Sequence, residues 1–113
     1  MEPTLPDTPD LVVTLVTAPT MDVARTIARA LVDARLVACA TLIDGVRSLY
    51  RWQGAVEEAS EVQLVLKTRR AHVPRIALAL KELHPYQVPE LVALPIVGGL
   101  APYLDWVRDG TGA

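Results

Sequence analysis

The chain has 113 residues, which is enough for one domain and too few for two. It is 51% hydrophobic but only 4% aromatic, with no phenylalanine, so we expect an ordinary globular protein with an aliphatic core. A net charge of −2 gives no long-range attraction to nucleic acid or to an anionic membrane, and no apolar run approaches the roughly 20 residues of a membrane helix. We therefore expect neither nucleic acid nor membrane as a partner.

The first ten residues predict a disordered leader rather than an export signal, because they hold three prolines and three acids but no lysine or arginine. The single Cys39 cannot form an internal disulfide, which favours a reducing compartment. Together these features predict a cytoplasmic protein.

The first elements of the domain are a strand and a helix. Residues 11–17 form a short β-branched run that is typical of a strand buried on both faces. Thr20 is a suitable N-cap, and apolar residues then recur at helical spacing, so we expect a helix that ends near Arg35.

A long β-hairpin should follow. Residues 38–52 and 56–68 are extended, Gly45 predicts a bulge in the first of these strands, and Gln53 and Gly54 supply the turn. Alternation places Tyr50 and Trp52 on the same face of the hairpin.

The second half of the chain repeats the pattern of helix and strand. We expect a helix over residues 73–83, a strand over 91–97, a short helix over 100–107 and a tail over 110–113. The order β-α-β-β-α-β predicts an α+β, ferredoxin-like sandwich that occupies residues 11–109 as a single domain.

The predicted hairpin is too long for its own domain. A strand of 14 residues spans roughly 46 Å, whereas a globule of this size is about 34 Å wide. The overhang, with Tyr50 and Trp52 on it, would expose apolar surface and unpaired strand edges, which monomers avoid. We therefore expect self-association, with two, three or four copies all compatible with the strand lengths.

Three segments and a C-terminal pattern carry a family signature: 36–52 (LVACATLIDGVRSLYRW), 57–68 (EEASEVQLVLKT), 83–96 (LHPYQVPELVALPI), and Tyr103, Leu104 and Trp106. Together they resemble the CutA family of divalent-cation-tolerance proteins. The resemblance implies a ferredoxin-like protomer that is similar to the PII signalling proteins and assembles as a stable homotrimer through its hairpins. It also implies a role in tolerance of copper and other divalent ions, with no established reaction.

Copper prefers thiolate, thioether and imidazole ligands, and at least two or three of them must converge. The resemblance implies a cysteine in the first strand and two histidines before the Pro-Tyr pair, but this chain has Val16 and Leu83-His84 at those positions. The candidate ligands for Cu²⁺ or Zn²⁺ are therefore His84 and, after it, Cys39, and no metal is required as a resident cofactor.

Each candidate also has a purely structural interpretation. Cys39 lies in an apolar run, where cysteine is usually a small buried hydrophobe. His84 could simply bond the last carbonyls of the preceding helix. Alternatively, the rigid loop between the two prolines brings His84, Tyr86 and Glu90 to a cleft between subunits.

Charged clusters flank the hairpin. Glu57, Glu58 and Glu61 could offer oxygen ligands to a divalent ion, but we interpret them as a solvated face that pairs with Arg47 or Arg51. A basic cluster at the junction of the second hairpin strand and the second helix is interpreted as solvated surface or, alternatively, as an anion site; it contains Lys67, Arg69, Arg70 and Arg75.

The chain carries none of the sequence patterns of the common enzyme classes that we considered, neither a nucleophile triad, a glycine-rich phosphate loop, HExxH nor CxxC. Our first hypothesis is thus a non-enzymatic homotrimer for divalent metal (copper) tolerance. Two alternatives stay open. One is a PII-like regulator that binds a small anion at subunit clefts through Lys67, Arg69, Arg70 and His84. The other is a scaffold that docks other proteins. The predicted interface or cleft residues are Tyr50, Trp52, Lys67, Tyr86 and Glu90.

Overall fold

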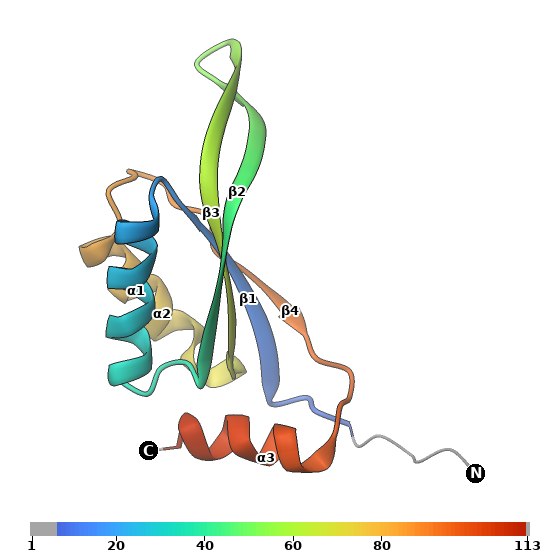
Figure 1. Ribbon diagram of the computed structural model, residues 1–113. Coiled ribbons are helices and arrows are strands. Elements are labelled where there is room, and N and C mark those ends of the chain that lie inside the picture. The colour runs from blue at the N-terminus through green and yellow to red at the C-terminus, as the bar shows by residue number, and fades with distance from the viewer. Residues whose placement is uncertain (1–6, 113) are drawn as a thin grey trace.

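The structure, a computed structural model, describes residues 7–112. Residues 1–6 of the predicted leader and Ala113 lie outside the described residues. The elements follow the predicted order, with an added 3₁₀ turn before the second long helix (Figure 1). They are β1 (Leu11–Ala18), α1 (Met21–Asp33), β2 (Cys39–Trp52), β3 (Ala55–Arg69), η1 (Arg70–His72), α2 (Val73–Leu83), β4 (Val92–Pro95) and α3 (Ala101–Gly110).

The four strands form one antiparallel sheet in the order β2-β3-β1-β4. Helices α1 and α2 lie side by side on one face of this sheet, and α3 crosses its end away from the hairpin turn (Figure 1). This is the predicted ferredoxin-like arrangement, and the prediction is confirmed.

The core lies between the two helices and the sheet. The side chain of Thr20 caps α1 by accepting a hydrogen bond from the amide of Val23 at 3.2 Å, as predicted. The helices bury Ile27, Leu31, Ile76 and Leu80 against aliphatic residues of β1 and β3. Each such side chain contributes about 1.5–3 kcal/mol, so aliphatic burial alone can hold this face together. The strand residues of the core are Val16, Ala18, Val62, Leu64 and Leu66.

A bulge in β2 changes which side chains share a face. Ile43 pairs with Gln63 but Val46 pairs with Glu61, so β2 holds one extra residue, and Gly45 takes φ +73° there. Beyond the bulge, the even-numbered residues of β2 join the sheet face that lies away from the helices. The bulge, as predicted at Gly45, thus decides where Tyr50 and Trp52 point.

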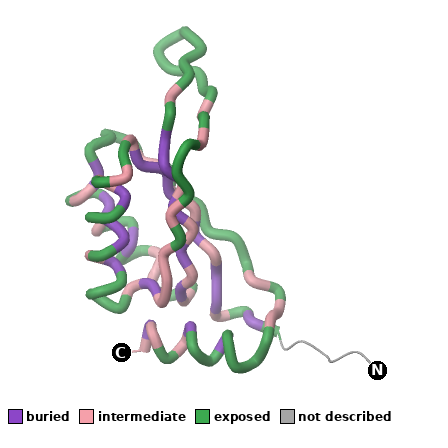
Figure 2. Tube along the Cα trace, viewed as in Figure 1, coloured by how far each residue is buried: buried purple, intermediate pink, exposed green. Residues whose placement is uncertain are grey.

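The hairpin turn is a two-residue loop in which Gln53 (φ 50°) and Gly54 (φ 82°) both have positive φ. The hairpin extends far beyond the rest of the sheet, because β1 pairs with β3 only from Val62 to Arg69. The protomer measures 51 × 32 × 21 Å. Figure 2 shows that the projecting part is almost entirely exposed, so the predicted overhang is present.

The sheet face opposite the helices is apolar and uncovered. Along β1 and β3 it presents Val13, Leu15 and Val65, which are half-buried. Ile43, Val92 and Leu94 continue it across the outer strands and are 45%, 47% and 48% exposed. We call these six residues the open face.

The two ends of the chain differ from expectation. Strand β4 is shorter than predicted, whereas α3 runs on to Gly110 and buries Leu104 and Val107 against Leu11. Thr8, just before β1, is attached to the fold, since it is 2% exposed and its hydroxyl donates to the carbonyl of Ile96. Within residues 7–112, no helix has the length and apolar character needed to cross a membrane.

Candidate functional site

His84 ends α2 and anchors the loop that follows. Its Nε2 lies 2.7 Å from the carbonyl oxygen of Thr17, and its Nδ1 lies 3.1 Å from the amide nitrogen of Tyr86. The amide can only donate, so Nδ1 accepts and Nε2 carries the proton that goes to Thr17. The partner is therefore a carbonyl of β1, not the last carbonyls of the helix. With the ring 7% exposed and both nitrogens engaged, ligation of a metal would require one of these bonds to break.

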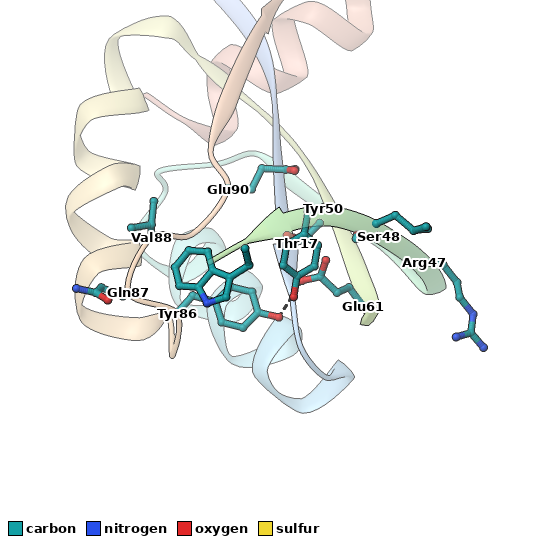
Figure 3. A pocket seen from close by; sticks show the side chains of 11 residues that line it. Thr17, Arg47, Ser48, Tyr50, Glu61, Tyr86, Gln87, Val88 and Glu90 are labelled. Carbon is teal, nitrogen blue, oxygen red and sulfur yellow. Dashed lines mark hydrogen bonds between the residues drawn. The ribbon is translucent and has the colours of Figure 1, made fainter. Parts of the chain in front are cut away.

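The loop directs Tyr86 toward the hairpin. The phenol donates a hydrogen bond of 2.8 Å to Oε2 of Glu61 (Figure 3). Burial, with the bond to Glu61 and its negative charge, raises the pKa of Tyr86 to about 12. At neutral pH the phenol therefore keeps its proton and acts as a donor to the carboxylate.

Glu61 is not part of a solvated face, contrary to our interpretation of the sequence, because it is only 6% exposed. Because side chains alternate along β3, Glu61 lies on the sheet face opposite to that of the buried Val62, and the loop that carries Tyr86 covers Glu61. The predicted pairing of this acidic stretch with Arg47 is confirmed for Glu58, since Nη1 of Arg47 lies 3.3 Å from Oε2 of Glu58.

A pocket of about 660 Å³ opens where the hairpin leaves the body of the protein. Four of the five predicted cleft residues line it, and Figure 3 shows that their side chains come from both the hairpin and the loop after α2. The predicted residues on its wall are Tyr50, Trp52, Tyr86 and Glu90, joined by Thr17, Arg47, Ser48, Leu49, Glu61, Gln87 and Val88.

Lys67, the fifth predicted residue, lies elsewhere. It is six residues from Glu61 along β3, about 20 Å, and its Nζ is 3.9 Å from Sγ of Cys39. The hydroxyl of Tyr103 is 4.0 Å from the same sulfur, and burial, with Cys39 beside it, raises the pKa of this phenol. Cys39 is half-buried, so in the protomer it is not the fully buried hydrophobe that its sequence context suggests.

The structure does not bring the candidate anion site together. Arg69 donates to the hydroxyl of Thr111 at 3.1 Å and to the carbonyl of Arg108 at 2.8 Å, which ties it to the end of α3. His84 lies at the opposite end of β1, beside Thr17. One small anion in the protomer cannot therefore contact both His84 and Arg69.

Metal ligands do not converge either. Within residues 7–112, no group of three or more histidine, cysteine, aspartate or glutamate side chains is placed to hold an ion. The described part of a single chain thus offers no complete divalent-ion site of the kind that copper or zinc needs.

Comparison with known proteins identifies the family. Residues 12–110 match the family described as CutA1 divalent ion tolerance protein. The divalent-cation tolerance protein CutA of Thermus thermophilus is 52% identical over 100 residues, which cover 88% of this chain and 97% of that protein. The chain belongs to the CutA1 divalent ion tolerance family. The predicted resemblance is thereby confirmed, and with it the assignment to a family of non-enzymatic tolerance proteins.

Further relatives agree in fold. The solved Cut A1 structure from Thermus thermophilus has a TM-score of 0.88 at 51% identity, with 90% of this chain and 99% of that chain covered. CutA from Synechococcus elongatus has a TM-score of 0.90 at 34% identity, with 96% of each chain covered. The human protein CutA is 47% identical over 96 residues, but the match spans only 54% of its length.

Within the CutA1 family, this chain departs at the positions that the resemblance links to copper. Val16 is 0% exposed and packs into the helix-covered core, where it can offer no ligand. Leu83 is partly buried against the same core. His84 alone keeps a ligand type at these three positions, and the sequence could not show that its ring is already hydrogen-bonded on both sides.

Proposed function

We propose that this CutA1 family member acts as a cytoplasmic homotrimer in tolerance of divalent metal ions, copper first among them. Membership of the family over residues 12–110 carries the proposal of tolerance. The uncovered apolar face of the sheet carries the proposal of assembly. One relative, from Archaeoglobus fulgidus, is named a periplasmic protein, so the location deserves a direct test by cell fractionation.

The open face supports assembly because it is exposed apolar surface and lies beside two unpaired sheet edges. Ile43, Val92 and Leu94 are each about half exposed on the antiparallel sheet, and contiguous apolar patches of this kind usually mark an interface. Strands β2 and β4 are both sheet edges, and β2 continues into the projecting hairpin. A second and third copy would cover the apolar face and shorten the exposed edges.

Sedimentation velocity tests the assembly. We expect a single species of three times the 12.3 kDa protomer mass, with or without a chelator. Leu94→Lys places a charge on the open face and should dissociate the trimer. Leu78→Lys is the matched control, because Leu78 is 66% exposed on α2, away from the open face. A wild-type monomer at micromolar concentration would contradict the architecture.

Calorimetry tests copper and zinc. If His84 is a ligand, His84→Ala should weaken the binding of Cu²⁺, whereas His72→Ala, at the other histidine, should not. Cys39→Ser tests the second candidate in the same way. Equal affinities in all three variants and the wild type would remove both residues from the site while leaving the trimer proposal untouched, because sedimentation tests that separately.

A further inference from the structure

Asp44 and Gly45, in the bulge of β2, bring an amide nitrogen and a carboxyl carbon close together. The backbone amide of Gly45 donates a hydrogen bond of 2.8 Å to Oδ1 of Asp44, the residue just before it. Because the bond from Oδ1 to Cγ is about 1.2 Å long, Cγ lies within about 4 Å of the Gly45 nitrogen. These two atoms are the ones that join when an aspartyl residue closes into a cyclic imide.

Gly45 leaves the approach between the two atoms unobstructed. Its φ is +73°, and a Cβ built on it would meet nothing within 4 Å. A side chain on the residue after an aspartate hinders ring closure, and glycine has none. Asp44 and Gly45 are both exposed, so solvent water reaches the bulge.

The β ladder does not restrain the bulge. Ile43 and Val46 are matched with residues of β3, whereas Asp44 and Gly45 are not. Alternation along β2 up to the bulge places Asp44 on the side of the sheet that carries the helices, as it does Leu42. The open face, which the proposed trimer covers, is on the other side of the sheet.

A second aspartyl-glycyl sequence in the chain provides a natural comparison. Asp109 and Gly110 form the end of α3, where each helical amide bonds to the carbonyl four residues earlier. The carbonyl of Asp109 also accepts a hydrogen bond from Arg35, and a Cβ on Gly110 would lie 3.1 Å from the Cβ of Ala38. The same dipeptide is thus held in a helix at one place and left unrestrained in a bulge at the other.

We propose that Asp44 is a site of covalent modification, at which aspartate converts spontaneously to isoaspartate through a succinimide. The Gly45 nitrogen bonds to Cγ of Asp44 and gives up its proton, and one carboxyl oxygen leaves as water. Water then opens the ring. Attack at Cγ restores aspartate, whereas attack at the former backbone carbonyl leaves isoaspartate. One water is lost and one is gained, so the step needs no oxidant, reductant or further reactant.

The product changes the backbone at the point that orients the hairpin. Isoaspartate carries the main chain through Cβ and Cγ, which adds one main-chain atom at position 44. The bulge decides the side of the sheet to which Tyr50 and Trp52 point, and a longer backbone there disturbs this register. The proposal rests on neither the trimer nor metal tolerance, because the reaction lies within one chain.

Incubation in heavy-oxygen water at neutral pH and physiological temperature measures the reaction in the full-length protein. Each ring opening adds one heavy oxygen atom, whether aspartate or isoaspartate forms. After digestion with trypsin in ordinary water, the peptides 36–47 and 109–113 report Asp44 and Asp109 separately. In the folded protein we expect Asp44 to gain the label at least about tenfold faster than Asp109, and in denaturant within about threefold of it.

Variants of the two aspartates assign the label. Asp44→Glu keeps the carboxylate but needs a larger ring, so labelling of peptide 36–47 should fall by about tenfold or more. Asp44→Asn keeps the oxygen that accepts from Gly45 and loses ammonia instead of water, so it should form isoaspartate about tenfold faster than wild type. Asp109→Glu is the matched control and should leave the rate at Asp44 unchanged.

Three results would overturn the proposal. Equal labelling of Asp44 and Asp109 in the folded protein would show that the geometry of the bulge confers no reactivity. Absence of label at Asp44 in the folded wild type, whatever its oligomeric state, would show that the ring does not close. Label that persists in peptide 36–47 of Asp44→Glu would have another origin than the succinimide.

Discussion

Arg108 holds both carboxylate oxygens of Asp10 across 98 positions of the sequence. Its Nε lies 2.8 Å from Oδ2 and its Nη2 lies 3.1 Å from Oδ1. This bidentate ion pair connects Asp10, just before β1, to α3, and α3 in turn packs Leu104 and Val107 onto Leu11. The first strand and the last helix of the domain are thus held together both by this ion pair and by apolar packing.

The Asp10 pair makes stability depend on acid pH. The hydrogen bond from Arg108 lowers the pKa of Asp10 below its ordinary value near 3.8. A lowered carboxyl pKa contributes stability that is present above the unfolded-state pKa and is lost as pH falls through the folded-state value. Asp10→Asn should therefore lower the melting temperature slightly at pH 7, where the exposed pair is screened by solvent, and the difference should vanish at strongly acidic pH.

Melting curves of Asp10→Asn, Asp33→Asn and wild type from pH 7 to pH 2 measure this. Asp33 is exposed on α1 and forms no ion pair with a residue in the described range 7–112, so it controls for the change in net charge. A constant difference between Asp10→Asn and wild type over the whole pH range would contradict the prediction.

His84 should matter for folding whether or not it binds metal. His84→Ala removes the donor to Thr17 and the acceptor for Tyr86, leaving two polar backbone groups with no side-chain partner in a buried place. We expect a loss of about 2–4 kcal/mol in the free energy of unfolding, measured by urea titration. His72→Ala, which removes one contact at the half-buried His72, should cost less. Equal losses of unfolding free energy in the two variants would show that the two hydrogen bonds of the His84 ring contribute nothing measurable to stability.

Local sequence signals determine most of this fold. Each of three residues marks a local backbone feature that favours its residue type. Thr20 caps α1, Gly45 takes the positive φ of the bulge, and Gly54 takes the positive φ of the hairpin turn. Helix α2 ends where proline forbids helix in the residue before it, so its limits matched the prediction. The extension of α3 to Gly110 was missed because its last turn is stabilised by distant partners, such as Arg69 on Arg108.

The site was less predictable, because its members meet only through tertiary structure. Glu61 stands in an acidic stretch and looks solvated, yet a loop 25 residues away buries it with Tyr86. Tyr50 and Trp52 could be placed on a common face from alternation alone, but their side of the sheet depends on the bulge. Lys67 shares a strand with Glu61, and only the strand geometry shows that the two are far apart.

Gly45 is required by its backbone angle rather than by crowding. A Cβ at this position would meet nothing within 4 Å, but φ is +73°. Gly45→Ala should therefore lower the free energy of unfolding by about 1–2 kcal/mol, and Gly45→Asn by less, since asparagine tolerates this region. Urea titration of the two variants checks the ranking, and a neutral Gly45→Ala would show that the bulge relaxes.

Tyr86→Phe should show how much of the protein's loss of stability at alkaline pH comes from ionisation of the Tyr86 phenol. The pKa of Tyr86 is raised to about 12, from an ordinary value near 10. A raised phenol pKa contributes stability that is fully present below the unfolded-state pKa and is lost as pH rises through the folded-state value. Wild type should therefore lose stability between about pH 10 and pH 12, and Tyr86→Phe should lose less over this range while being about 1–2 kcal/mol less stable at pH 7.

Tyrosinate absorbance near 295 nm, together with urea titrations at each pH, measures both effects. Tyr103→Phe is the control, because it removes the other phenol whose pKa is raised while leaving the bond to Glu61 in place. An unchanged high-pH absorbance step in Tyr86→Phe would mean that the phenol does not face the Glu61 carboxylate in solution.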